Sequence, residues 1–206
     1  MKEFSFRTPD TDIYLAKYSP EECEELLEKY KADKDLEEFF RGKSKKHLYQ
    51  QALKIDMLNK KGLLEKLVYL PDGKPLLKDG SYISISHSGD YIGIAHSKSV
   101  PVGLDIQLYS DKPEKILNKF ASGDEISLLE TLVKKNLPIY LWCAKEAVYK
   151  AAGIKGLSFK NQIKVSFKSR LPHEALALTN NSQKKYRLLA GKIEDLFLVL
   201  AEEIGL

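Results

Sequence analysis

The stretch from Tyr140 to Gly153, YLWCAKEAVYKAAG, constrains the fold more than any other part of this 206-residue chain. Its spacing predicts a helix, and at about 100° per residue the side chains divide into two faces. One face is small and apolar, with Ala144, Ala147, Val148 and Ala151. The other is bulky and charged, with Trp142, Lys145, Glu146, Tyr149 and Lys150. The small face can dock, which leaves the charged face available for chemistry.

Glu146 and Lys150 also have a simpler interpretation. They are four residues apart, so on a helix they can form an exposed ion pair worth about a few tenths of a kcal/mol. For an isolated Glu-x-x-x-Lys sequence this interpretation is preferred. Motifs elsewhere in the chain reverse that preference.

Composition limits the class of protein. A chain of 206 residues with 43% hydrophobic content can bury one sizeable core or two small ones. The formal charge of +4, from 33 Lys and Arg against 29 Asp and Glu, admits anionic ligands without indicating nucleic acid. Because Cys23 and Cys143 lie far apart, they suggest neither a zinc site nor a disulfide. With no long apolar segment, we expect a soluble, cytoplasmic protein with no membrane contact.

Strand and helix signals alternate along the chain and indicate an α+β fold. Helices are predicted over 19–30, 38–61, 113–120, 124–134 and 138–152. Strands are predicted over 12–18, 67–70, 81–86, 91–95, 102–106, 163–167, 175–178, 186–190 and 196–201. Turns are expected at 71–75, at 87–90 and at the Asn-Asn pair 180–181. The repeated order predicts two α+β halves, 1–99 and 100–206, although no residue-level repeat is visible.

Three short motifs precede the charged helix: Gly73-Lys74-Pro75, Ile85-Ser86-His87-Ser88 and Val102-Gly103-Leu104-Asp105-Ile106. Each alone is commonly a turn, a hairpin residue or the end of a strand. In this order, followed by W-x-x-K-E-x-x-x-K, they form a pattern that chance would rarely produce. Asp105 and Glu146 are hard oxygen donors that can hold one Mg²⁺. The nitrogen donors suit several phosphate groups, as in a pyrophosphate with a further phosphate; they are Lys74, His87, Lys145 and Lys150.

The order GKP, ISHS, VGLDI and WCAKEAVYK, with GIKGLS after it, resembles the long, Sfp-like class of 4′-phosphopantetheinyl transferases. The resemblance covers about residues 43–159. It implies two similar α+β halves related by a pseudo-two-fold axis, with the ligand site at their junction, in a monomer. It also implies transfer of the phosphopantetheine arm of coenzyme A to a serine of an apo acyl or peptidyl carrier protein, with release of adenosine 3′,5′-bisphosphate.

Carried over residue by residue, the resemblance implies a role for each matching position. Asp105 and Glu146 would bind Mg²⁺, or Mn²⁺ in its place, and Glu146 would also be the base that acts on the carrier serine. Lys150 would contact phosphate and protonate the leaving group. The coenzyme A contacts would be Lys46, Lys74, Ser86, His87, Lys145 and Lys150.

One position departs from the family pattern. Many members have an acid two residues after the aspartate, where this chain has Gln107. A neutral amide oxygen can coordinate a cation but contributes no charge, so either Gln107 is a weak metal ligand or water takes its place. The alternative function is therefore a non-catalytic module that binds coenzyme A or another nucleotide. Retention of Asp105, Glu146 and Lys150 favours the enzyme.

Overall fold

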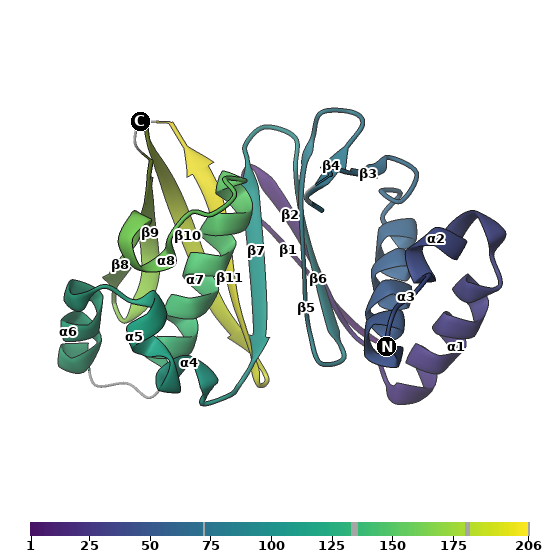
Figure 1. The fold of residues 1–206 in the computed structure, drawn as a ribbon, viewed down its shortest axis with the longest axis horizontal. Coiled ribbons are helices and arrows are strands. Elements are labelled where there is room, and N and C mark those ends of the chain that lie inside the picture. Colours follow the sequence, from purple (N-terminus) through teal and green to yellow (C-terminus); the bar gives the residue numbers. More distant parts are fainter. Residues whose placement is uncertain (72, 133–135, 180–181, 206) are drawn as a thin grey trace.

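Two antiparallel sheets lie next to each other at the centre of the protein, and helices cover their outer faces (Figure 1). The computed structural model describes residues 1–71, 73–132, 136–179 and 182–205. The predicted turn at 180–181 lies outside the described residues, as does residue 72 of the turn at 71–75. The mixture of helices and strands confirms the α+β class predicted from the sequence.

The first half of the chain forms a four-stranded sheet in the order β1-β2-β6-β5. Its elements are β1 (Lys2–Arg7), β2 (Thr11–Lys17), α1 (Pro20–Lys31), the 3₁₀ helix η1 (Lys34–Leu36), α2 (Glu37–Phe40), α3 (Lys45–Lys60), β3 (Leu67–Tyr69), β4 (Pro75–Leu77), β5 (Tyr82–Ser88) and β6 (Tyr91–Ser97). Leu53 and Met57 of α3 share a core with Ile83 of β5. Helices therefore cover one face of this sheet and leave the other face to the second half.

The helix predicted over 38–61 is interrupted. Helix α2 ends at Phe40, and α3 begins only at Lys45. Between them Gly42 has a φ of 71°, in the left-handed region, which cannot continue a right-handed helix. By contrast, α1 begins where the sequence predicts, because Ser19 and Glu22 form a reciprocal capping box.

The predicted hairpin is present, but its turn is tighter than expected. His87 and Ser88 belong to β5, and only Gly89 and Asp90 separate it from β6. Gly89 has a φ of 60°, which suits a two-residue turn. Strand β1 was not predicted because Phe4 and Phe6 are its only two apolar residues, too short an alternation to identify a strand.

The second half forms a five-stranded sheet in the order β7-β11-β10-β9-β8. Its elements are β7 (Val102–Leu108), α4 (Lys112–Lys115), α5 (Leu117–Phe120), α6 (Gly123–Leu132), α7 (Leu137–Ala152), α8 (Phe159–Gln162), β8 (Ile163–Lys168), β9 (Leu171–Leu178), β10 (Gln183–Ile193) and β11 (Leu196–Ile204). Helix α7 lies along the outer face of this sheet (Figure 1). Within the described ranges, the helices are too short or too polar to cross a lipid bilayer.

The two sheets share part of their strand order. In each half, the strand that precedes the helices pairs with the last strand, which pairs with the strand before it: β2-β6-β5 in the first half and β7-β11-β10 in the second. This order agrees with two similar halves. The pseudo-two-fold axis itself stays a prediction.

The halves are joined by a common core and by a row of serine side chains. Ile13 and Leu15 of β2 pack with Leu104 of β7 and Leu200 of β11. Three alternate serines of β5 accept hydrogen bonds from alternate backbone N–H groups of β7: Ser84 from Leu104, Ser86 from Ile106 and Ser88 from Leu108, at 2.9, 3.2 and 2.9 Å. These bonds satisfy donors at the edge of the second sheet and fix β7 beside β5.

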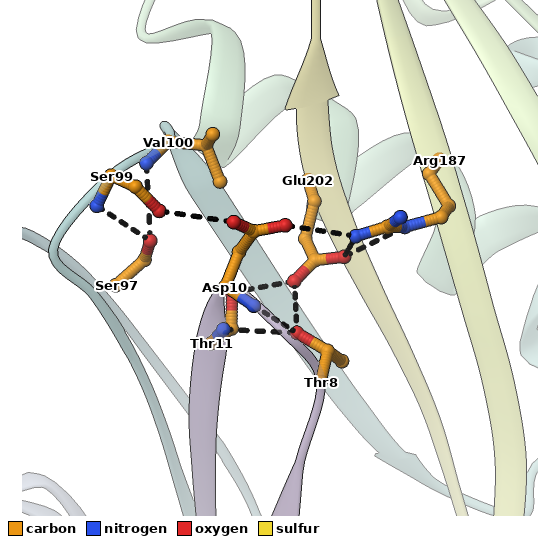
Figure 2. Close-up of polar contacts among 8 residues, drawn as sticks. All are labelled: Thr8, Asp10, Thr11, Ser97, Ser99, Val100, Arg187 and Glu202. Carbon is orange, nitrogen blue, oxygen red and sulfur yellow. Dashed lines mark hydrogen bonds and ion pairs between the residues drawn. The ribbon is translucent and has the colours of Figure 1, made fainter.

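A second polar contact ties the turn between β1 and β2 to the second half (Figure 2). The Glu202 side chain is fully buried and accepts hydrogen bonds from the hydroxyls of Thr8 and Thr11. Arg187 Nη2 lies 2.7 Å from the Glu202 carboxylate and 3.2 Å from that of Asp10. Because a buried carboxylate requires such partners, this network holds the two halves in one relative position.

Candidate functional site

Helix α7 docks on β7 at a glycine. The helix ends at Ala152, and Gly153, the C-cap residue that follows it, has a φ of 63°. On β7, a Cβ at Gly103 would collide with the backbone of Ala147 and Ala151, so only glycine permits this approach. The small face predicted for the helix is buried. Because strand side chains alternate, Asp105, two residues after Gly103, faces the same helix.

Asp105 and Lys150 form an ion pair where the two halves meet. Lys150 Nζ lies 2.8 Å from Asp105 Oδ1 and also donates to the Leu104 carbonyl oxygen, at 2.9 Å. Ser86 Oγ accepts from Lys150 at 3.1 Å and donates to Asp105 Oδ1 at 3.0 Å. Asp105 is only 7% exposed. Since Ser86 comes from the first half and the other two from the second, both halves build this cluster.

Glu146 lies one turn before Lys150 on α7 and is half-buried. Burial raises the pKa of its carboxyl group above the ordinary value, the negative charge of Asp105 raises the pKa further, and Lys150 lowers it. Glu146 and Asp105 are therefore close enough to interact. A carboxylate with a raised pKa is a better base near neutral pH.

The donor set fits a divalent cation. Two interacting carboxylates disfavour each other's charge, and a cation between them would relieve that repulsion. Among the residues that the structure describes, no group of three or more His, Cys, Asp and Glu side chains is placed to hold an ion. Mg²⁺ commonly takes one or two protein carboxylates and completes its shell with waters and phosphates. Asp105 and Glu146 meet that requirement.

Gln107 follows Asp105 on the same face of β7 and is half-buried. Its amide nitrogen donates to the Leu108 carbonyl oxygen at 3.3 Å. The amide oxygen is uncharged, so it would attract a cation less than a carboxylate would. A ligand role for Gln107 therefore stays a prediction.

A cavity of about 340 Å³ opens between the two halves next to Lys150. Its lining includes Lys74, Pro75, Ile85, Tyr149, Lys150 and Lys155. Lys74 Nζ rests against Gly153, where an added Cβ would lie 2.1 Å from it. This contact brings the GKP turn to the C-terminal end of α7, where the helix dipole favours a cation. Lysines from both halves thus line a cavity suited to phosphate groups.

Two other predicted coenzyme A contacts belong to β5 and α3 of the first half. His87 is exposed and follows Ser86 on β5, so it points to the opposite face of that strand, the face on which α3 packs. Lys46 lies in the first turn of α3, but its side chain is outside the described part of the structure.

The structure does not bring Lys145 into the cavity. Its side chain is fully buried, and Nζ lies 2.7 Å from the Glu125 carboxylate. It also donates to the carbonyl oxygens of Phe159 and Ile163, both at 2.7 Å. Although Lys145 precedes Glu146, it points about 100° away around the helix, toward α6 and β8. Its position supports a structural role instead of the predicted contact with coenzyme A.

Comparison with known proteins points to one family. Residues 101–197 match the family model of the 4′-phosphopantetheinyl transferase superfamily, which is just under half of the chain. A protein of Synechocystis sp. named "Putative 4′-phosphopantetheinyl transferase" is 36% identical over 102 residues. That alignment includes 45% of this chain, and the chain spans only 41% of the length of this relative.

The segment that matches the family model contains β7 and α7, and therefore Asp105, Glu146 and Lys150. Lys74 and Ser86 lie outside it. Their place in the site rests on the geometry described above.

Several residues of the site were not predicted from the sequence. Cys143 is fully buried, and burial and the nearby negative charge of Asp105 raise the pKa of its thiol well above the usual value. Ser84 and Ser88 extend the contact that Ser86 makes with β7. The alternation of serines along β5 is the one signal that could have identified them, because it places them on the same face as Ser86.

Proposed function

We propose that this chain belongs to the 4′-phosphopantetheinyl transferase superfamily and is a transferase of the long, Sfp-like class. It would move the phosphopantetheine arm of coenzyme A to a serine of an apo acyl or peptidyl carrier protein and release adenosine 3′,5′-bisphosphate. The observation that carries this proposal is the Asp105–Lys150 ion pair beside Glu146, next to a lysine-lined cavity. The similarity over residues 101–197 supports it independently.

Asp105 and Glu146 would hold the cation, Mg²⁺ or Mn²⁺, with Gln107 as a weaker candidate. When bound, the cation would neutralise charge that develops on the pyrophosphate. Lys74 and Lys150 would contact the phosphates of coenzyme A, and Lys46 and His87 stay proposed contacts in the first half. The Ser86 hydroxyl would orient Lys150 in addition to its proposed contact with coenzyme A.

Two protein groups would move protons. Glu146, directly or through a water, would take the proton of the carrier serine, whose oxygen attacks the phosphorus next to the pantetheine arm. The bond from that phosphorus to the bridging oxygen breaks, and its electron pair leaves with adenosine 3′,5′-bisphosphate. Lys150 would give a proton to this leaving group. The raised pKa of Glu146 and the cavity beside Lys150 suit these roles.

We also propose that residues 1–99 and 100–206 act as one transferase unit. The cavity is lined by residues of both halves, so neither half alone would complete it. The monomeric state and the cytoplasmic location expected from the sequence stay predictions.

The test is the release of adenosine 3′,5′-bisphosphate from coenzyme A, measured by chromatography. The full chain is incubated with coenzyme A and an apo carrier protein, with Mg²⁺ or with a chelator. We expect release only when both the carrier and the metal are present, and we expect Asp105→Asn to abolish it. Binding of coenzyme A with no release under any of these conditions would support the non-catalytic binding module instead.

A further inference from the structure

The Lys150 ammonium is fully engaged by neighbouring protein groups. An ammonium has three N–H donors. Here they meet three acceptors: Asp105 Oδ1 at 2.8 Å, the Leu104 carbonyl oxygen at 2.9 Å and Ser86 Oγ at 3.1 Å. Lys150 therefore already contacts one oxygen, Oδ1, of the carboxylate that is the proposed cation ligand.

A divalent cation at Asp105 would face the positive charge of Lys150 on the same carboxylate. The two like charges would repel each other strongly because Asp105 is only 7% exposed, so water screens them little. This repulsion would favour movement of the Lys150 ammonium away from Oδ1 when the cation binds.

The Lys150 side chain can move into the cavity between the halves. Its side chain is 28% exposed and also lines the cavity between the halves, together with Lys74. A lysine side chain has a flexible four-carbon stem. The ammonium can therefore rotate away from β7 into the cavity without movement of α7. In the cavity it would meet a phosphate group of the ligand.

We propose that Lys150 is a switch that couples the two ligands of this site. Without ligands it neutralises Asp105, and when a divalent cation binds it moves to a phosphate in the cavity. The cation and the phosphate ligand then bind cooperatively, each strengthening the other by the same factor. This inference rests on the proposed function, because it assumes a cation at Asp105 and a phosphate ligand in the cavity.

The decisive measurement is the affinity for Mn²⁺ or Mg²⁺ by calorimetry, on the full chain without coenzyme A or carrier protein. Because Lys150→Met removes the competing charge, we expect it to bind the cation at least about tenfold more tightly than wild type. The matched control is Lys155→Met, which removes an exposed positive charge from the same cavity; we expect a change of less than about threefold. Equal or weaker cation binding by Lys150→Met would overturn the switch.

Coenzyme A binding gives a second measure. In wild type, saturating Mg²⁺ should raise the affinity for coenzyme A, and this gain should be smaller in Lys150→Met. If Lys150→Met folds poorly, Lys150→Gln serves in its place. Thermal unfolding adds a readout, since a cation that binds more tightly stabilises the variant more than wild type.

The outcomes separate the switch from the proposed function. If wild type binds the cation and Lys150→Met binds it no better, the switch is wrong, while transfer to a carrier protein still decides the function. If neither protein binds a cation, the metal site and the switch are both wrong.

Discussion

Gly103 of β7 lies directly against Ala147 of α7: a Cβ at Gly103 would come within 1.8 Å of the Ala147 carbonyl oxygen. The obstacle is helix backbone, which cannot turn aside as a flexible side chain can. The position of Glu146 and Lys150 over Asp105 therefore depends on a glycine that has no proposed role in the reaction.

Gly103→Ala should destabilise the protein by about 3 kcal/mol or prevent folding, because the helix must move away from the sheet. The measurement is unfolding in urea followed by circular dichroism. Gly191→Ala on β10 is the control, since a Cβ there would meet its nearest neighbour, Leu198, at an ordinary 3.8 Å. If Gly103→Ala unfolds at the same urea concentration as the control, the close docking of α7 is wrong.

Lys145→Met should reduce stability and leave coenzyme A binding intact in the folded fraction. The substitution leaves the buried Glu125 carboxylate without its cation, a change that typically costs about 3–5 kcal/mol. Lys74→Met replaces a lysine that lines the cavity and should have the opposite effects. We expect a small change in stability and weaker binding of coenzyme A. A loss of affinity in folded Lys145→Met with unchanged stability would restore Lys145 to the ligand site.

Glu146 should make the metal-free protein less stable as the pH rises. Its pKa in the folded protein lies above the ordinary value of 4.5, so the folded chain binds this proton more tightly than the unfolded chain does. The stability gained from the proton is fully present below the unfolded pKa and is lost as the pH rises through the folded pKa.

In Glu146→Gln this loss of stability with rising pH is absent, because glutamine does not titrate. In the presence of a chelator, Glu146→Gln should therefore gain stability relative to wild type as the pH rises above the ordinary value of 4.5, measured by urea unfolding at each pH. Glu130→Gln, at an exposed position on α6, controls for the removal of one negative charge. A difference between Glu146→Gln and wild type that stays constant across this range would contradict the burial of Glu146 beside Asp105.

The sequence predicts those parts of the site that depend on local periodicity. The spacing within 140–153 correctly predicted the docking face of α7. The structure brings Asp105 and Lys150 together, and their proposed roles stay predictions. The direction of Lys145 was not predictable, because its partner Glu125 lies on a different helix and no repeat in the sequence connects them.

The contact between the halves was not predictable from the sequence either. Ser84, Ser86 and Ser88 form an ordinary alternating polar face, and only the position of β7 turns them into partners of its backbone. Sequence motifs thus indicated which residues are candidates for the chemistry, whereas contacts between distant segments determine how those residues are held.

The most direct test of the central claim is the intact mass of apo carrier proteins after incubation with the full chain, coenzyme A and Mg²⁺. The panel should include carriers of fatty acid, polyketide, nonribosomal peptide and lysine pathways. We predict that at least one carrier gains the mass of a phosphopantetheine group with wild type and none does with Asp105→Asn. If no carrier gains mass although the folded wild-type chain binds coenzyme A, the protein is not a phosphopantetheinyl transferase for these carriers, and the central claim is contradicted.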